Sequence, residues 1–171
     1  DARAFCDLSN SIYARKVSPE YYCWQFFETP HPAYVQTMWL GDRLVGTFGV
    51  HIVGDARMRR AMCLDIMVAP DMQGKALVAD LGRSADQEAR RLGATLIGVV
   101  ANDRARRALQ KHLGWHLVEE LAEWNAQTAY RVSDISVAVN RSRSTPHGEE
   151  RAVFYPRSEE YLIWRTSTPR Y

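Results

Sequence analysis

The sequence predicts a mixed fold of the α+β or α/β class, in which an antiparallel hairpin precedes a central βαβ unit. Two patterns carry this prediction: apolar, β-rich runs around a Gly-Asp turn, and an amphipathic helical segment between two strand-like segments. The chain has 171 residues, of which 46% are hydrophobic and 25% are charged. This length and composition are typical of one globular domain with a substantial core.

The first part of the sheet is expected between residues 34 and 70. Within Tyr34–Gly54, two apolar runs flank the Gly41-Asp42 dipeptide, which is typical of a hairpin turn. The segment Met58–Pro70 then predicts a third strand, which is buried toward its end because its last residues are apolar. We therefore expect three consecutive strands ahead of the first central helix.

A helix and a parallel strand are expected next. Residues Gln73–Leu92 have helical spacing, and Gly93 would end this helix as its C-cap. The segment Thr95–Ala101 is short and almost wholly apolar, as expected of a buried strand in a parallel pair. One side of the helix carries its recurring apolar residues, which are Leu77, Leu81, Ala85, Ala89 and Leu92.

A second helix and two more strands complete the predicted order. Asn102 or Asp103 would cap a helix that Gly114 ends. Segments 115–124 and 130–139 then predict strands. The order of elements becomes β-β-β-α-β-α-β, with a right-handed βαβ unit at its centre.

Composition and charge argue against several classes of function. The net charge of +2 does not indicate a nucleic-acid partner, and a mean hydropathy of -0.35 without a long apolar run argues against a membrane span. The three cysteines are an odd number without metal-ligand spacing. They predict free, mostly buried thiols in a reducing cytoplasm, and no metal site.

Two segments far apart in the chain share a pattern. One begins at Glu20 and the other at Glu160, and both read Glu-Tyr-x-x-Trp, with Thr-Pro a few residues later. Trp is rare, so we favour a true internal repeat over a chance likeness of two amphipathic segments. We therefore expect one domain at residues 1–139, followed at residues 140–171 by a linker and the start of a second, truncated copy.

The turn after the third strand has the features of an anion site. Gly74 leaves room for an anion at the unpaired backbone N–H groups of a helix N-terminus, and Lys75 adds a positive charge. Val78 crowds the first helical turn, because its side chain is β-branched. The alternative interpretation is an ordinary strand-to-helix connection with a flexible glycine.

The segment from about Leu40 to Glu120 resembles the GNAT superfamily of acyltransferases. The resemblance rests on the hairpin, the strand that ends in Val-x-Pro, the turn, the helix-strand-Asn-helix order and a final Gly-Trp pair. It implies a mixed, mainly antiparallel sheet in which one parallel strand pair splays apart. The Trp-rich opening of the chain is similar to that of some bacterial GNAT proteins, including proteins with two GNAT lobes in tandem.

The resemblance implies acetyl-CoA or another acyl-CoA as the cofactor, and no metal. In this family the turn reads Gln/Arg-x-x-Gly-x-Gly/Ala, so Gln73 matches, whereas Ala76 and Val78 replace the expected small residues. Asn102 would contact the cofactor, although a helix cap is an equally good reason for it and is compatible with that contact. The cofactor-binding residues so implied are Met67, Val68, Gln73, Gly74, Lys75, Ala76, Leu77, Val78, Asn102 and Arg106.

Two carboxylates are candidates for accepting the proton of an attacking amine. Asp65 lies in the strand that would line the cleft, where alternation places Leu64 and Ile66 together on the other face. The alternatives for it are a hydrogen-bonded Asp at a bulge and an Asp that faces solvent. Glu28 is the second candidate, because the opening segment often forms one wall of the acceptor site in this family.

The usual proton donor of the family is missing at its expected position. That donor is a Tyr four residues before the Gly-aromatic pair, and the position is Gln110, which cannot act as an acid. His112 lies two positions along the same helix and therefore faces another side. Acyl transfer does not strictly need this donor, since a general acid typically contributes about 10²–10⁴-fold.

The function that the resemblance implies is acyl-CoA-dependent N-acyl transfer, with acetyl as the first choice, by direct attack of an amine on the thioester. Two alternatives stay open: a lobe without catalysis that serves as a binding or structural module, and an enzyme that takes its acyl group from an acyl carrier protein. The expected partners are a small-molecule amine or peptide acceptor, and a second GNAT lobe or a homodimer partner, with neither nucleic acid nor membrane.

Overall fold

A computed structural model describes residues 1–14, 16–55, 58–117, 158–167 and 169. The predicted strand at 130–139 and most of the one at 115–124 lie outside the described residues. The same holds for the predicted domain boundary at residue 139 and for the first part of the linker and repeat expected at 140–171.

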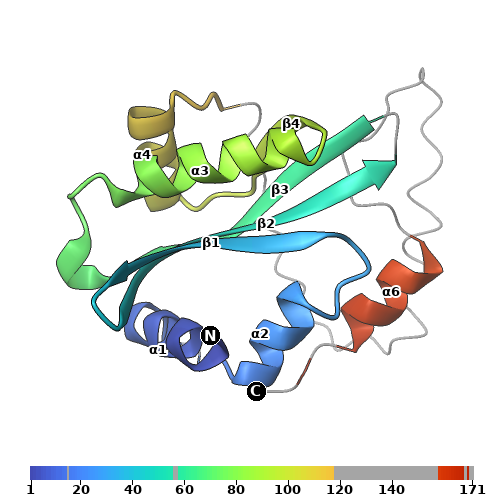
Figure 1. The fold of residues 1–171 in the computed structure, drawn as a ribbon, viewed down its shortest axis with the longest axis horizontal. Coiled ribbons are helices and arrows are strands. Elements are labelled where there is room, and N and C mark those ends of the chain that lie inside the picture. The colour runs from blue at the N-terminus through green and yellow to red at the C-terminus, as the bar shows by residue number, and fades with distance from the viewer. Residues whose placement is uncertain (15, 56–57, 118–157, 168, 170–171) are drawn as a thin grey trace, which may run out of the picture. The chain divides into compact units, whose positions relative to one another are not determined.

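Four strands form one mixed sheet in the order β1-β2-β3-β4 (Figure 1). β1 pairs with β2 and β2 with β3 in antiparallel fashion, while β3 and β4 are parallel. The predicted hairpin, third strand and parallel pairing are thereby confirmed, but the prediction that the parallel strand is buried is wrong, since Leu96 is 51% exposed. The bounds are β1 (Ala33–Leu40), β2 (Arg43–Asp55), β3 (Met58–Val68) and β4 (Ala94–Val99).

Helices cover both faces of this sheet (Figure 1). On one face lie α1 (Ala2–Ile12) and α2 (Pro19–Phe26). On the other face lie α3 (Leu77–Arg91), which connects β3 to β4, and α4 (Asp103–Leu113). A short 3₁₀ turn, η1 (Pro70–Met72), follows β3, and α6 (Glu159–Thr166) contacts α2.

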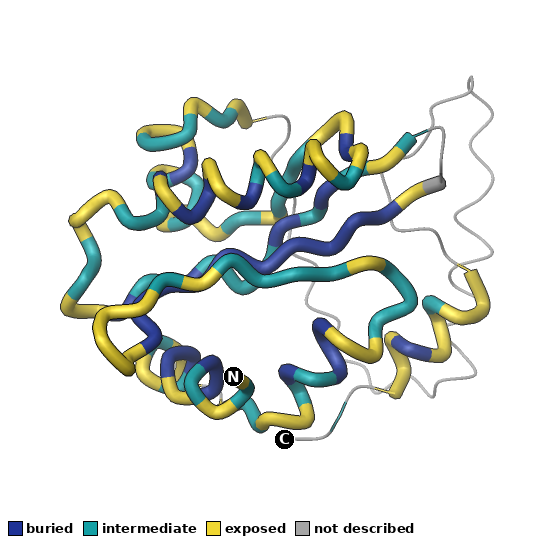
Figure 2. The backbone as a smooth tube through the Cα atoms, viewed as in Figure 1, coloured by how far each residue is buried: buried dark blue, intermediate teal, exposed yellow. Residues whose placement is uncertain are grey.

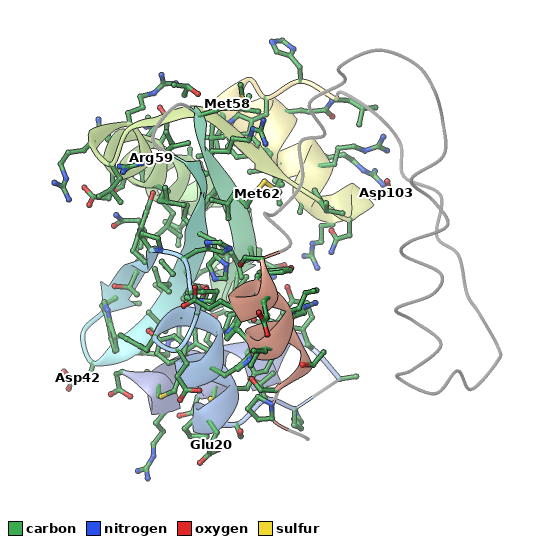
Figure 3. The ribbon with its side chains drawn as sticks, turned by 90° about the vertical axis from the view of Figure 1, so that its right-hand side faces the viewer. Glu20, Asp42, Met58, Arg59, Met62 and Asp103 are labelled. Atoms are coloured by element: carbon green, nitrogen blue, oxygen red, sulfur yellow. The ribbon has the colours of Figure 1, made fainter. Side chains whose placement is uncertain are left out.

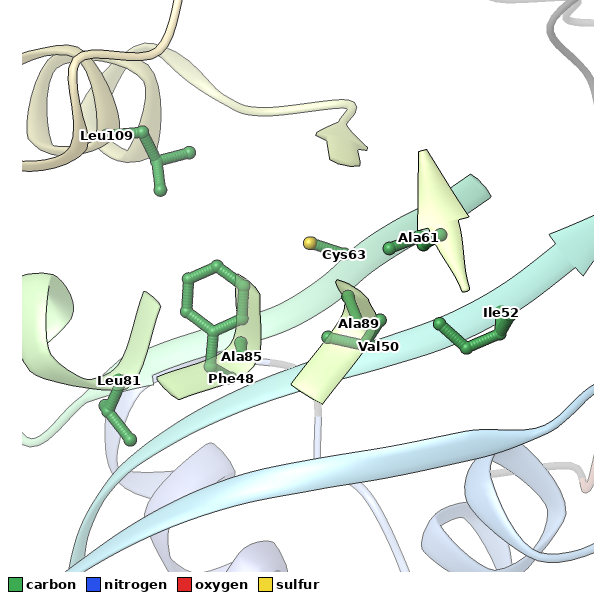
Figure 4. Packing of buried hydrophobic residues seen from close by; sticks show 10 residues of the cluster. Phe48, Val50, Ile52, Ala61, Cys63, Leu81, Ala85, Ala89 and Leu109 are labelled. Carbon is green, nitrogen blue, oxygen red and sulfur yellow. The ribbon is translucent and has the colours of Figure 1, made fainter. Parts of the chain in front are cut away.

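Each face of the sheet has its own hydrophobic core. Phe48, Val50 and Ile52 alternate along β2 and point toward α3, as the close view in Figure 4 shows. Figure 2 shows that β2 is buried along most of its length between the two layers of helices. The helical residues of the first core are Leu81, Ala85, Ala89 and Leu109. The second core joins Phe5, Cys6, Leu8, Tyr22 and Phe26 to Leu44, Val45 and Met67.

A β-bulge in β3 reverses the side that the following residues face. The pairing of β2 with β3 shifts between Thr47 and Gly49, so that two residues of β3, Asp65 and Ile66, oppose a single residue of β2. Leu64 packs against the core under α1, whereas Ile66 packs against the core under α3. The prediction that these two residues share a face is therefore wrong, because the bulge inserts one residue into the alternation.

The first central helix begins later than the sequence predicts. Its spacing favours a start at Gln73, but α3 begins at Leu77. The backbone of Gly74 has a φ of +83° and that of Ala76 a φ of +58°, and residues in these left-handed conformations cannot belong to a right-handed helix. The other end matches the prediction, since Gly93 follows the helix with a φ of +87°.

The predicted caps of α4 are confirmed. Asn102 is the N-cap, and its side-chain oxygen accepts a hydrogen bond of 2.9 Å from the backbone N–H of Ala105. Gly114 ends the helix in the left-handed conformation, with a φ of +67°. These caps fix the start of α4 beside the carboxyl end of β4.

Gly49 gives a test of how closely α2 packs on the sheet. A Cβ added there would lie 2.8 Å from the carbonyl oxygen of Leu64 and 2.8 Å from Cζ of Phe26. We expect Gly49→Ala to lower the free energy of unfolding by about 1–3 kcal/mol, because the core must shift to admit the methyl group. Urea denaturation monitored by circular dichroism measures this change.

The matched control is Gly98→Ala in β4, where an added Cβ would meet no atom within 4 Å. We expect that variant to be as stable as the wild type or slightly more stable, since alanine restricts the unfolded chain. Equal stability of the two variants would contradict the close approach of α2 to β2.

Candidate active site

A cavity opens where the two parallel strands stop pairing. β3 and β4 are paired as far as Cys63, which lies opposite Val99. Beyond that pair, Ile66, Met67 and Val68 line a cavity of about 370 Å³, which is within the size range of small-molecule sites. The turn before α3 and the first turns of α4 also line it. The parallel pair implied by the resemblance is present, and β3 continues past the end of β4 to Val68.

The turn that precedes α3 lines this cavity. The residues from Gly74 to Val78 that line it are Gly74, Ala76, Leu77 and Val78. The first N–H groups of a helix have no intrahelical partner, and Ala76 provides no side-chain cap for α3. The partial positive charge of the helix N-terminus therefore lies at the cavity wall, where it favours an anion.

Gln73 joins the end of β3 to α4. Its amide nitrogen donates a hydrogen bond of 3.0 Å to the carbonyl oxygen of Val68. Its amide oxygen accepts a hydrogen bond from the guanidinium group of Arg104. Arg104 itself lines the cavity, so it adds a positive charge to the site that the sequence pattern does not indicate. The signal that could have identified it is its place in the first turn of the helix that Asn102 caps.

Two of the cations implied by the sequence lie outside the cavity lining. Lys75 is exposed, and its Nζ lies 3.3 Å from Sδ of Met72. Arg106 forms an ion pair of 2.9 Å with Asp103, which Figure 3 labels at the start of α4. The other implied cofactor residues, among them Gln73 and Asn102, do line it.

Asp65 occupies the bulge of β3 in a left-handed conformation, with a φ of +47°. The hydroxyl group of Thr47 donates a hydrogen bond of 2.8 Å to its carbonyl oxygen. Its carboxylate oxygen Oδ2 is buried and has no hydrogen-bond partner among the described residues. Burial raises the pKa of this carboxyl from its ordinary value of 3.8 to about 6. Such a group is ionised at neutral pH but can take up a proton.

Tyr13 is a cavity residue that sequence reasoning missed. It directly follows α1 as its C-cap and lines the cavity. Burial raises the pKa of its hydroxyl group, and the negative charge of Asp65 raises it further. No sequence signal places it there, because α1 reaches the cavity only through the packing of the second core.

The cavity face of α4 carries His112 rather than Gln110. Gln110 is exposed and does not line the cavity. His112 does, together with Ala105, Ala108 and Leu109, which share its side of the helix at spacings of three and four residues. The two residues therefore face different sides, as expected, and the side of His112 is the one toward the cavity.

Neither Glu28 nor Asp65 is among the residues that line the first cavity. Glu28 is exposed and lines a second cavity of about 730 Å³ together with Thr29 and Pro30. Residues of α6 complete that cavity, including Trp164. Of the two carboxylates, only Asp65 lies close enough to a residue of the first cavity, Tyr13, to raise its pKa.

The described residues contain no group of three or more His, Cys, Asp or Glu side chains that could hold a metal ion. In the same part of the chain, every helix is too short or too polar to cross a membrane. All three cysteines are free thiols, and Cys6 and Cys63 are buried.

The sequence profile described as the acetyltransferase (GNAT) family matches residues 3–115. A search of curated proteins finds no match. Many solved structures match, and the three described below are 9–16% identical to this chain. These structural matches show that the fold is shared, since their identities are too low to show more.

Three solved structures illustrate the likeness. A ribosomal-protein-alanine N-acetyltransferase from Brucella melitensis is 16% identical, with a TM-score of 0.54, over 77% of this chain and 94% of that chain. A glucosamine-6-phosphate N-acetyltransferase from Arabidopsis thaliana is 12% identical, with a TM-score of 0.58, over 72% of this chain and 93% of that chain. AAC(6')-Iy, solved with the bisubstrate analogue CoA-S-monomethyl-acetylneamine, is 9% identical, with a TM-score of 0.60, over 74% and 92%.

The buried carboxyl of Asp65 makes the stability of the fold depend on pH. Its pKa is raised to about 6 on folding, so the folded chain binds this proton more tightly than the unfolded chain. The ionised carboxyl therefore destabilises the fold above pH 6, and this effect disappears as the pH falls toward 4. We expect Asp65→Asn to raise the free energy of unfolding by about 1–3 kcal/mol at about pH 8, and to have little effect at about pH 4.

Asp71→Asn provides a control of opposite sign. The carboxyl of Asp71 is exposed, and the guanidinium group of Arg43, 2.6 Å away, lowers its pKa. The stability that this pair adds is present above the ordinary pKa and is lost as the pH falls. Urea denaturation of both variants at the two pH values tests the difference. A gain for Asp65→Asn that does not change with pH would contradict the burial of an ionisable group.

Proposed function

The chain belongs to the acetyltransferase (GNAT) family, and we propose that it is an N-acyltransferase that moves an acyl group, in the first place acetyl, from acyl-CoA to an amine. The observation that carries this proposal is the cavity lined by the end of β3, beyond its last pair with β4, with the N-terminus of α3 at its wall. A strand edge beside an anion site suits a ligand that has both a peptide-like arm and a pyrophosphate.

The donor site would use the cavity residues in two groups. The N–H groups from Leu77 onward, with the guanidinium group of Arg104, would hold the pyrophosphate of acyl-CoA. The edge of β3 at Met67 and Val68 would hold the pantetheine arm beside Asn102. Gln73 supports this arrangement, because it ties Arg104 to the end of the same strand. When bound there, acyl-CoA supplies an activated thioester carbonyl.

The proton transfers would be divided between two neighbouring residues. The amine attacks the thioester carbonyl carbon, the carbon–sulfur bond breaks, and the amine loses a proton. We assign that proton to Asp65, whose pKa of about 6 leaves it ionised at neutral pH. The phenol of Tyr13 stays protonated because its pKa is raised, so it would supply a proton to the leaving thiolate. This assignment replaces Gln110 by a residue from α1.

The acceptor is proposed as an amine of a small molecule or of a peptide. The names of the solved relatives include both classes: a ribosomal-protein alanine and glucosamine-6-phosphate. The free thiols of Cys6 and Cys63 suit a reducing compartment, for which we propose the cytoplasm.

A thiol-release assay with acetyl-CoA and a panel of small amines and peptide N-termini tests the proposal. We expect turnover above the background hydrolysis, together with a rise in melting temperature on adding CoA. Asp65→Asn should lose about 10²–10⁴-fold in kcat/KM. The kcat/KM of the wild type should fall below pH 6 as the carboxyl becomes protonated, and the variant should lack this step.

Glu28→Gln is the matched control, because Glu28 lines the other cavity and should leave kcat/KM unchanged. The absence of both turnover and a CoA-induced shift would contradict the proposal. A CoA-induced rise in melting temperature without turnover would instead favour a lobe without catalysis. A rise in melting temperature produced only by an acyl carrier protein would favour that protein as the acyl donor. Its phosphopantetheine has a single phosphate, so the turn before α3 would not need to bind a pyrophosphate.

Ala76→Gly tests whether the turn before α3 is the pyrophosphate site. The φ of +58° at Ala76 is unfavourable for a residue with a Cβ, so glycine should stabilise the free protein by about 0.5–1 kcal/mol. Removing the methyl group also lets a phosphate approach the N–H groups, and we expect CoA to bind about 3- to 10-fold more tightly. Calorimetry and urea denaturation separate the two effects. A more stable variant with unchanged CoA affinity would mean that the pyrophosphate lies elsewhere.

A further inference from the structure

The helices α2 and α6 are built on the same pattern. Positions 140 residues apart hold the same residue type at the cap, at the first turn and at the contact. Each helix has a Ser N-cap whose side chain accepts from the backbone N–H three residues on, at 3.4 Å in Ser18 and 3.1 Å in Ser158. The matching pairs are Ser18 and Ser158, Glu20 and Glu160, Tyr21 and Tyr161, and Trp24 and Trp164.

The contact between the two helices is reciprocal. The indole N–H of Trp24 donates to the carbonyl oxygen of Trp164 at 2.9 Å, and the indole N–H of Trp164 donates to the carbonyl oxygen of Trp24 at 2.9 Å. The two rings are stacked, with their centroids 4.7 Å apart and their planes 14° apart. Both side chains are buried, at 1% and 7% exposure. Trp24 thus contacts Trp164 in the same way as Trp164 contacts Trp24. Such reciprocity is characteristic of an isologous contact.

The surroundings of the two tryptophans repeat as well. The ring of Tyr21 lies 5.5 Å from that of Trp24 at an angle of 41°. The ring of Tyr161 lies 5.6 Å from that of Trp164 at an angle of 48°. Two helices that pack by chance have no reason to reproduce both the contact and the aromatic neighbour of each half.

We propose that α2 and α6 are equivalent halves of a quasi-two-fold joint, and that α6 is the counterpart of α2 in a second repeat of the fold. The surface around Trp24 therefore binds one kind of partner, a second helix of its own Ser-x-Glu-Tyr-x-x-Trp type. Figure 3 shows α6 against α2, on which Glu20 is labelled. This inference concerns a part of the molecule outside the proposed acyl-CoA cavity and does not depend on it.

The exposed apolar residues of α6 support the same assignment. In α2, Tyr22 is buried against Phe5 of α1, with their ring centroids 4.5 Å apart. The residue 140 positions later is Leu162, which is 49% exposed, and the next residue, Ile163, is 62% exposed. These residues leave an apolar face on α6 at the position where α1 covers α2.

The two helices also differ in how they contact the sheet. The carbonyl oxygen of Gln25 accepts a hydrogen bond of 2.9 Å from Nε2 of His51 on β2. Burial lowers the pKa of His51 to about 4, so its ring is neutral and Nε2 keeps the donated proton. The counterpart of Gln25 is Arg165, whose guanidinium group lies over the Trp24 ring, 5.7 Å from its centroid. Both helices therefore reach β2: α2 through this hydrogen bond, and α6 through the ring of Trp164, whose centroid lies 5.8 Å from that of His51.

The full chain with Trp164→Glu tests whether the joint is self-complementary. A buried carboxylate would displace α6 and free the α2 surface. Because that surface fits its own motif, we expect this variant to dimerise through α2, doubling its molar mass in sedimentation at high micromolar concentration. Leu162→Glu, on the exposed side of α6, should keep the molar mass of the wild type. The double variant Trp24→Glu with Trp164→Glu should lose the dimer.

A peptide with the sequence SEEYLIWRTSTP provides the second measurement, since it supplies the α6 half in trans. We expect it to dissociate the Trp164→Glu dimer, and a scrambled peptide to have no effect. A folded Trp164→Glu variant that stays monomeric would overturn the proposal. A dimer that survives both the peptide and the Trp24→Glu change would overturn it too, because association would then use another surface.

Discussion

The bulge at Asp65 is the constraint on which the site depends. By inserting one residue into β3, it turns the end of the strand over, so that residues after it face the opposite core. The pairing with β4 ends at Cys63, close to the same place, and the cavity opens there. The left-handed backbone that the bulge needs is one that Asp tolerates better than most residues. A single local irregularity therefore reorients the end of β3 and holds the carboxyl of Asp65 close to Tyr13, which lines the cavity.

The turn before α3 also combines an irregular backbone conformation with a place in the cavity wall. Two left-handed residues delay the start of the helix until Leu77, and the delay brings the first helical N–H groups to the cavity wall. An uninterrupted helix from Gln73 would have satisfied several of these groups internally. Gln73 instead connects the strand end to Arg104. Positive charge thus reaches the cavity from the main chain and from α4, while Lys75 stays outside the lining.

Many of the strands and helix ends were predictable from local sequence signals. The hairpin follows from the turn at Gly41, and the caps of α4 from Asn102 and Gly114, because each signal acts within a few residues. The bulge at Asp65 was one of the alternatives that a lone Asp in an apolar strand left open, but strand alternation itself carries no mark of an inserted residue. Tyr13 was missed for a different reason: its position depends on how α1 packs across the sheet. Signals between distant segments, apart from the repeated Glu-Tyr-x-x-Trp pattern, are absent from a single sequence.

The reciprocal tryptophan contact has a consequence for how the two helices can change over evolutionary time. Each indole donates to a carbonyl oxygen, and no side-chain replacement at the acceptor residue removes a carbonyl. The contact therefore demands two indole rings and places little demand on the other positions. Tyr22 and Phe26 correspond to Leu162 and Thr166, which are different in size and polarity. Because the acceptors are main-chain carbonyl oxygens, the other positions of the two helices can change in sequence while the geometry between the helices is kept.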